Sequence, residues 1–427
     1  MIDKIIPLLK RIWSLRDLRD KLIFTFAIVV LFRILAHIPL PGVDTTGLES
    51  IFNNNQILGM LDLFSGGSVS RFSIVMLGVG PYITASIVIQ LLTIAIPALE
   101  QLQKEGEYGK QKINQYTRYL SIPLSIVESY GFIRLLQSQG ILSSTSISDY
   151  LLIITISTAG SVFLMWLGEL ISERGIGNGI SLLISAGIIA GIPSQIMATA
   201  QVVDNKLLIG IEMLLIVVLM IAFIVWMNQA ERRVPVSYAR RVRSDRTVGV
   251  IDSYLPIKAN AAGVIPIIFA TSMLVIPGVF AQFLQTSQSQ NIKDIASSIN
   301  VFLSNNLYYG ILFFVLVFLF TFFYTSIIFQ PKNIAENLQK QGGFIPGIRP
   351  GLQTSAYLSM IIYKVTFAGA FFLSIIAVFP FLMQSITGIR TLAIGGTGIL
   401  IIVSVTLEFV SQVKSNLIMR SYDNFAS

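Results

Sequence analysis

Ten apolar stretches, each about as long as a membrane crossing, constrain this chain more than any motif does. A helix needs about 20 mainly apolar residues to cross the hydrocarbon core of a bilayer. Hydrophobic residues make up 54% of the chain and charged residues only 12%. We therefore predict an all-α membrane protein with ten transmembrane helices. The expected spans are residues 22–38, 73–92, 119–136, 151–171, 176–192, 207–227, 261–283, 307–329, 357–383 and 392–409.

Ten crossings place both termini on one side of the membrane and divide into five and five. With an odd number of spans in each half, two structural repeats must have opposite orientations, and inverted repeats commonly place a pathway at their interface. The expected halves are residues 1–192, with spans one to five, and residues 193–427, with spans six to ten. The halves share no clear sequence identity, so this expectation depends on the span count.

The positions of Lys and Arg orient the chain. Cytoplasmic loops of membrane proteins carry an excess of these residues. Most of the cations here lie at the termini and in loops on the same side, which include the long loops 228–258 and 330–354. The opposite loops hold only Arg71, Lys206, Lys293 and Arg390. We therefore expect both termini to be cytosolic, or stromal in a plastid.

Residues 59–97 cannot form a single span because their first half is polar. Asp62, Arg71 and the sequence SGGS at 65–68 precede the apolar run that begins near Ile74. Polar, non-helical backbone at membrane depth is tolerated only where protein buries it or water reaches it. Two interpretations stay open. The segment is either a surface loop outside the membrane or a re-entrant piece in a water-lined cavity.

The two long basic loops carry further patterns. Residues 233–238 and 247–254 alternate in polarity, which predicts a hairpin that projects from the membrane. Loop 330–354 predicts a short amphipathic turn and then a tip rich in Gly and Pro that carries Arg349. The first loop also carries Arg240, Arg241, Arg243 and Arg246. These charges either only orient the chain or form a surface for a nucleic-acid backbone or an acidic protein patch.

The sequence offers no catalytic constellation. It has no cysteine and a single histidine, His37, and it lacks a phosphate-binding glycine loop and any metal-ligand spacing. We therefore predict no enzymatic activity, no metal and no cofactor. Arg33 and Glu128 lie at similar depths in spans one and three, so an ion pair between them is favoured over a functional site.

Eight segments, in the same order along the chain, resemble the SecY family, the channel subunits of the bacterial and plastid protein translocon. They are IPLPGVD (38–44), LFSGGSVSRFSI (63–74), LGVGPYITASIVIQLL (77–92), KINQYTRYL (112–120), MWLGELISERGIGNGISLLI (165–184), NAAGVIPIIFA (260–270), GFIPGIRPG (343–351) and GGTGILIIV (395–403). The variant PALEQLQKEGE (97–107) and the short tail after Arg420 resemble the cyanobacterial and plastid branch.

The resemblance implies a channel that translocates unfolded secretory polypeptides and releases transmembrane segments laterally into the membrane. It implies a plug segment before span two, a pore ring, a lateral gate between spans two and seven, and docking sites on the basic loops. The implied plug residues are Leu61, Asp62, Leu63, Phe64, Ser65, Gly66, Gly67, Ser68 and Arg71. The implied ring residues are Ile83, Ile87, Ile184, Ile188, Ile268 and Ile401. The implied gate residues are Gln90 and Asn260, and the implied docking residues are Arg240, Arg241, Arg243, Arg246 and Arg349.

Depth provides an independent argument for the ring. Ile83, Ile268 and Ile401 lie roughly 11–15 Å into their expected spans, close to the middle of a ~30 Å hydrocarbon core. Isoleucine is common in this chain, however, so depth alone does not separate a ring from ordinary core residues.

The resemblance also implies partners. These are SecE-like and SecG-like small membrane subunits, the SecA motor ATPase, the ribosome and signal-sequence-bearing polypeptides, in a bacterial plasma membrane or a thylakoid membrane. From the residues alone a second class stays open, a secondary transporter of a small solute, because inverted halves would suit it equally.

Overall fold

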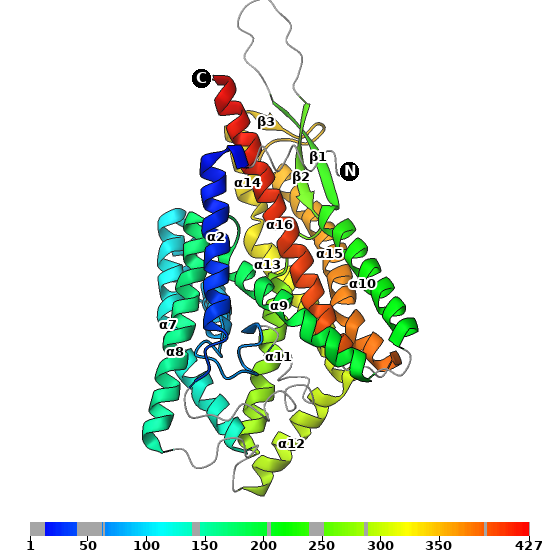
Figure 1. The fold of residues 1–427 in the computed structure, drawn as a ribbon. Helices are drawn as coiled ribbons and strands as arrows, with labels where there is room; N and C mark the ends of the chain where they lie inside the picture. The colour runs from blue at the N-terminus through cyan, green and yellow to red at the C-terminus, as the bar shows by residue number, and fades with distance from the viewer. Residues whose placement is uncertain are drawn as a thin grey trace, which may run out of the picture.

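Long helices and one small sheet make up the computed structural model, which describes residues 13–40, 62, 65–138, 146–202, 206–238, 252–285, 289–387 and 391–426 (Figure 1). The helices are α2 (Arg16–Leu35), α5 (Gly80–Ala95), α6 (Pro97–Lys104), α7 (Glu107–Ser138), α8 (Ile147–Arg174), α9 (Gly179–Val202), α10 (Lys206–Gln229), α11 (Ile265–Leu284), α12 (Gln290–Ser304), α13 (Asn306–Ile328), α14 (Pro331–Lys340), α15 (Leu352–Thr387) and α16 (Thr391–Ala426). The strands are β1 (Glu231–Tyr238), β2 (Asp252–Lys258) and β3 (Gly343–Phe344).

Each of the ten expected spans overlaps one long helix, and the chain is a multi-pass helical membrane protein. Within the described residues, five helices are long and apolar enough to cross a membrane, or six if α5 and α6 count as one span bent by 102°. The five are Ile147–Arg174, Gly210–Gln229, Asn306–Lys340, Leu352–Ser385 and Gly398–Met419. Shorter apolar helices lie in α9 and α11, whereas α2 and α7 contain Arg33 and Glu128. The count of ten crossings therefore stays a prediction.

The helix boundaries differ from the expected spans at α5. The expected span begins at residue 73, but residues 66–79 form turns and α5 begins at Gly80. Gly78 adopts a positive φ of 58°, which a helix does not contain, and Pro81 follows in the first turn, where its missing N–H costs nothing. At the other end Pro97 begins α6. The amphipathic helix α12 was not expected from the sequence.

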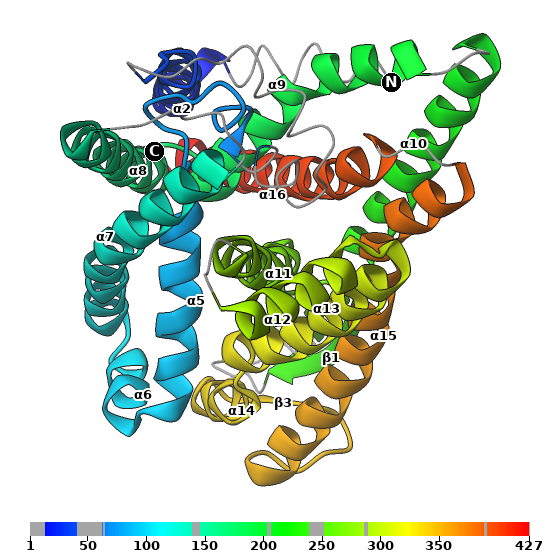
Figure 2. The same ribbon diagram turned by 90° about the horizontal axis from the view of Figure 1, so that it is seen from below.

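The helices form two groups around a central line. Figure 2 shows α2 and α5–α8 on one side and α11–α15 on the other. α5 and α11 face each other where the two groups meet. α5 contacts α11 directly, and α9 packs along α16. The largest cluster of buried apolar side chains lies between the groups and draws residues from both.

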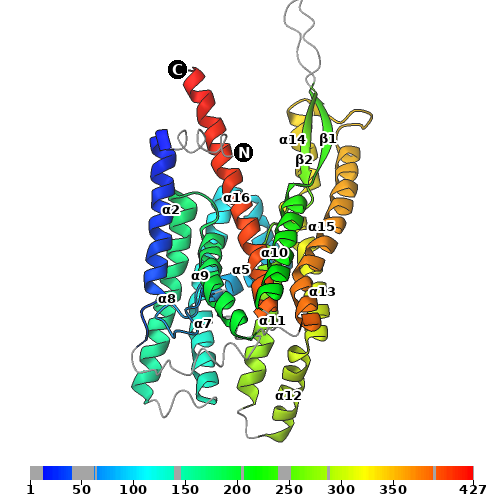
Figure 3. The ribbon, with the colours of Figure 1, turned by 45° about the vertical axis from the view of Figure 1, so that its right-hand side comes forward.

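A three-stranded antiparallel sheet in the order β2-β1-β3 joins the two basic loops. The predicted hairpin is confirmed, with Arg232 opposite Ile257, but its second strand lies at 252–258 and not at 247–254. β3 pairs with the other edge of β1, where Ser237 lies opposite Phe344. Val234 and Val236 face inward and pack with α14 and the start of α15 (Figure 3). The two loops therefore form one packed unit.

Candidate functional site

Six isoleucines from four helices meet in the central cluster. Ile83 and Ile87 come from α5, Ile184 and Ile188 from α9, Ile268 from α11 and Ile401 from α16. All are buried, with exposed fractions from 0 to 7%. All six residues of the implied ring therefore belong to one buried apolar cluster, although Ile83 and Ile401 are more than 300 positions apart in the sequence.

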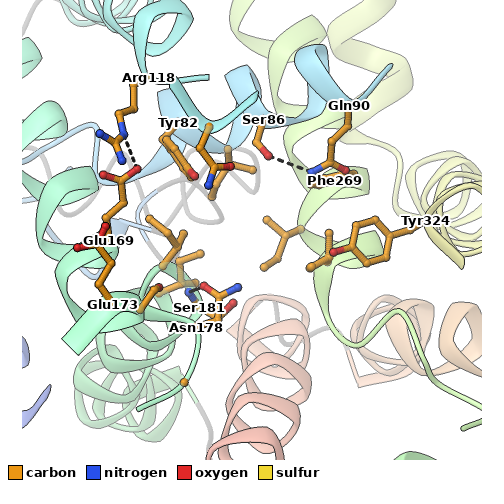
Figure 4. Close-up of a pocket in the computed structure, with 18 of the residues that line it drawn as sticks. Tyr82, Ser86, Gln90, Arg118, Glu169, Glu173, Asn178, Ser181, Phe269 and Tyr324 are labelled. Carbon is orange, nitrogen blue, oxygen red and sulfur yellow. Dashed lines mark hydrogen bonds and ion pairs between the residues drawn. The ribbon is translucent and has the colours of Figure 1, made fainter. Parts of the chain in front are cut away.

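A cavity of about 480 Å³ reaches this cluster from one end, because Ile83, Ile184 and Ile268 line it (Figure 4). Its walls come from α5, α7, α8, α9, α11, α13 and α16. Polar side chains form much of the lining, including Tyr82 and Asn178. The cavity therefore has a partly polar lining and borders the buried apolar cluster at Ile83, Ile184 and Ile268.

One wall of the cavity carries an ion pair. Arg118 Nε donates to Glu169 Oε1 at 2.7 Å and ties α7 to α8. On the α5 wall, Gln90 Nε2 donates to Ser86 Oγ at 3.1 Å, and Gln90 Oε1 is buried without a partner among the residues that the structure describes. An unpaired buried amide oxygen is a costly feature that an incoming donor would relieve.

The plug segment is folded onto the first group of helices where the structure describes it. Asp62 Oδ1 accepts from the Ser70 backbone N–H at 2.8 Å, and Ser68 Oγ donates to the carbonyl of Ser65 at 2.6 Å. These bonds satisfy backbone groups that have no helix to join. Of the implied plug residues, Leu61, Leu63 and Phe64 lie outside the described residues. The segment is therefore a compact structure, and a simple extended surface loop is excluded for the part described.

Two glycines make the closest approach between the plug segment and the ring. A Cβ at Gly66 would lie 2.7 Å from the Cα of Gly187, on α9 between Ile184 and Ile188. Gly66 also has a φ of +75°, which favours glycine. The sequence predicted a flexible Gly pair, but it did not reveal Gly187 as the partner.

The expected pair between Arg33 and Glu128 is absent, and this expectation was wrong. Arg33 Nη1 donates to the carbonyl of Gly66 at 2.8 Å, and Glu128 accepts from Thr84 Oγ1 at 3.4 Å. Similar depth on two helices does not fix the rotation of either helix about its axis. Here the rotation of α2 turns Arg33 to the plug segment.

The end of the plug segment is tied to the end of α2. Ile74 N–H donates to the carbonyl of Ile38 at 3.0 Å, and Leu40 N–H donates to that of Phe72 at 2.8 Å. Arg71 contacts His37 Nε2, and His37 Nδ1 lies 2.7 Å from the carbonyl of Arg33. His37 thus belongs to a structural anchor, a role that its isolated position in the sequence could not reveal.

The two implied gate residues lie in different surroundings. Gln90 lines the cavity on α5. Asn260 precedes α11, and its Nδ2 donates to Asn228 Oδ1 at 2.9 Å, while Asn228 Nδ2 donates to Ser404 Oγ at 3.2 Å. Asn260 therefore joins α10 and α16 below the hairpin. The gate position of Asn260 was implied by the resemblance and stays a prediction; α11 begins only at Ile265, after Gly263 with a φ of +64°.

The docking residues are described only in part. Arg349 is exposed in a turn held by Thr354 Oγ1, which donates to the Arg349 carbonyl at 2.9 Å. Glu231 accepts from Arg233 Nε at 2.7 Å and raises the pKa of this guanidinium, so Arg233 stays charged at the base of the hairpin. Arg240, Arg241, Arg243 and Arg246 lie outside the described residues.

The cavity, the buried isoleucine cluster and the folded segment beside it lie in a fold that solved protein-conducting channels share. A solved structure of a protein-conducting channel has a TM-score of 0.62 to this chain at 19% identity and covers 92% of this chain and 91% of its own. A SecY structure, described as having a plug domain that stabilises the closed state and maintains a membrane seal, has a TM-score of 0.64 at 21% identity over 92% and 91%.

Relatives with higher sequence identity show the family to which the chain belongs. The family model described as SecY matches residues 73–410. The protein translocase subunit SecY of Streptomyces coelicolor is 39% identical over 97% of this chain and 98% of its own length. That of Pseudomonas aeruginosa is 40% identical over 96% and 93%. The chain belongs to the SecY family. The alternative of a small-solute transporter gains no support from these relatives.

Proposed function

We propose that this chain forms the path by which unfolded secretory polypeptides cross the membrane, entering by the cavity and passing the six-isoleucine ring. The observation that supports the proposal is that all six isoleucines belong to one buried cluster and that three of them, Ile83, Ile184 and Ile268, line the cavity. A ring of branched apolar side chains excludes water and ions at rest, and it can surround a passing chain without binding it.

The plug segment closes the ring in the resting channel and moves aside when a polypeptide enters. Among the described residues, Gly66 is held by a hydrogen bond from Arg33 and by its close approach to Gly187, and a displacement of the segment would break both contacts. The contact between α5 and α11 serves as the lateral gate, through which transmembrane segments reach the lipid. The two inverted halves, predicted as residues 1–192 and 193–427, move relative to each other about a hinge near this boundary, which lies within α9 at Pro193.

Both termini and the sheet of the basic loops lie on the cytosolic side, or the stromal side in a plastid. Figure 1 supports this orientation, since the hairpin and the end of α16 lie at one end of the molecule and α12 at the other. The membrane is a bacterial plasma membrane or a thylakoid membrane.

The sheet unit binds partners that supply the energy, while the chain itself performs no catalysis. Relatives are named as translocase subunits, and similar folds occur in ribosome-channel complexes. We infer that this chain binds the ribosome and the SecA motor ATPase through Arg349, Arg240, Arg241, Arg243 and Arg246. SecE-like and SecG-like subunits complete the complex in the membrane.

The test is export of a signal-bearing polypeptide into vesicles that contain the chain with its small subunits and the motor. We expect protease-protected product with the unaltered chain and at least about tenfold less with Arg349→Glu, because like charges at a docking surface repel a partner. Lys293→Glu is the matched control, since this exposed cation lies on α12 at the opposite end. No product from the unaltered chain would refute the function, and equal export by both variants would refute the docking role of Arg349.

A further inference from the structure

The wall of the cavity formed by α7 and α8 carries more negative than positive charge. Arg118, Glu169 and Glu173 are the charged residues among those that line the cavity (Figure 4). Arg118 is paired with Glu169 at 2.7 Å. Glu173 makes no hydrogen bond or ion pair with the other residues that the structure describes, and Arg174 beside it is exposed and does not line the cavity. The wall therefore has one carboxylate without a counter-charge.

The position of Glu173 is unfavourable for the helix that holds it. α8 ends at Arg174, so Glu173 lies in the last turn, where the helix dipole places partial negative charge. Glu169 and Glu173 are also spaced i and i+4, and like charges at that spacing destabilise a helix. Both effects oppose a carboxylate here. A cation from outside the helix would offset both effects.

The opposite wall is apolar. Ile265, Ile268 and Phe269 from α11 line the cavity there, next to Tyr324 from α13. The cavity therefore presents a wall with excess negative charge on α7 and α8 and an apolar wall on α11. A secretory signal sequence has the matching order, a positively charged n-region followed by an apolar h-region of about 7–15 residues.

We propose that Glu173, supported by Glu169, binds the cationic n-region of the signal sequence while the apolar h-region lies along α11. This inference rests on the proposed function and adds a residue that determines which signal sequences are accepted. The cytosolic side of the chain is otherwise strongly basic and repels a cationic n-region. A local carboxylate inside the cavity offsets that repulsion at the point of entry.

The test compares two substrates that differ only in the n-region, one with two Lys residues and one with Gln in their place. We expect Glu173→Lys to lower the export rate of the Lys substrate about three- to tenfold, as for a partly exposed ion pair replaced by repulsion, and to leave the Gln substrate unchanged. Glu173→Gln should have a smaller effect in the same direction. Glu107→Lys, an exposed carboxylate on α7 outside the cavity, is the matched control and should not discriminate.

Proximity can be measured separately because the chain has no cysteine. Glu173→Cys should form a disulfide with a Cys placed in the n-region of a stalled substrate, and Glu107→Cys should not. If Glu173→Lys slowed both substrates equally, the carboxylate would serve a cytosolic partner or the fold, and the inference would be wrong. Equal effects of Glu173→Lys and Glu107→Lys would also overturn it. Failure of the unaltered channel to export either substrate would instead refute the proposed function.

Discussion

Replacing Gly66 by Ala should displace the plug segment from the ring. Gly66 has a φ of +75°, and a side chain in that region costs roughly 1–2 kcal/mol. Its Cβ would lie 2.7 Å from the Cα of Gly187, and overpacking against backbone costs about 1–3 kcal/mol more. The two costs together are at least about 2 kcal/mol, the sum of their lower limits. This free energy raises the ratio of displaced to seated plug segment about 30-fold. Ion conductance of single channels in planar bilayers measures this ratio.

Two matched variants separate the contributions. Gly67 has a φ of +76° but nothing within 4 Å of an added Cβ, so Gly67→Ala has only the conformational cost. Gly187→Ala has only the steric cost, because α9 is helical there. We expect the conductance of Gly66→Ala to exceed that of either variant. Equal conductance of Gly66→Ala and Gly67→Ala would show that the contact with α9 does not hold the segment. An ion-tight Gly66→Ala channel would refute the plug assignment.

Two further predictions concern the ring and the junction below the hairpin. Ile188→Asn should raise ion leakage and admit defective signal sequences, because a polar side chain hydrates the constriction. Ile189→Asn should do neither in the same bilayer and export assays, since Ile189 is 49% exposed on the outer face of α9, and leakage from both variants would disprove the ring. Asn260→Ala should lower the stability of the purified complex by about 1 kcal/mol, because it removes the hydrogen bond to half-buried Asn228 Oδ1. Thermal unfolding in detergent measures this loss, and an unchanged midpoint would mean that water replaces Asn260.

Hydrophobicity and motif order were sufficient to predict the fold class and the family. Apolar runs of about 20 residues must be helices in lipid, since every backbone group needs a partner there. The six isoleucines were identified by resemblance, and their depths could be checked from helix rise alone. The hairpin was readable because Val234 and Val236 alternate with polar residues on one strand.

Only the tertiary structure decided which side chains meet. The sequence placed Arg33 and Glu128 at the same depth, but the rotation of each helix about its axis depends on all its packing partners, and Arg33 turned to Gly66. The resemblance implies that Asn260 lies at the gate, and only the tertiary structure shows that its side chain donates to Asn228 on α10.

The pairing of the two basic loops in one sheet was also decided only by the tertiary structure. β1 and β3 are more than 100 residues apart, and β3 is only two residues long, so no local pattern predicts their pairing. Local periodicity reports which face of an element is apolar, and for that reason the sequence determined the helices and the hairpin. Contacts between distant elements depend on rotation, register and close backbone approach, which are set only when the whole chain packs.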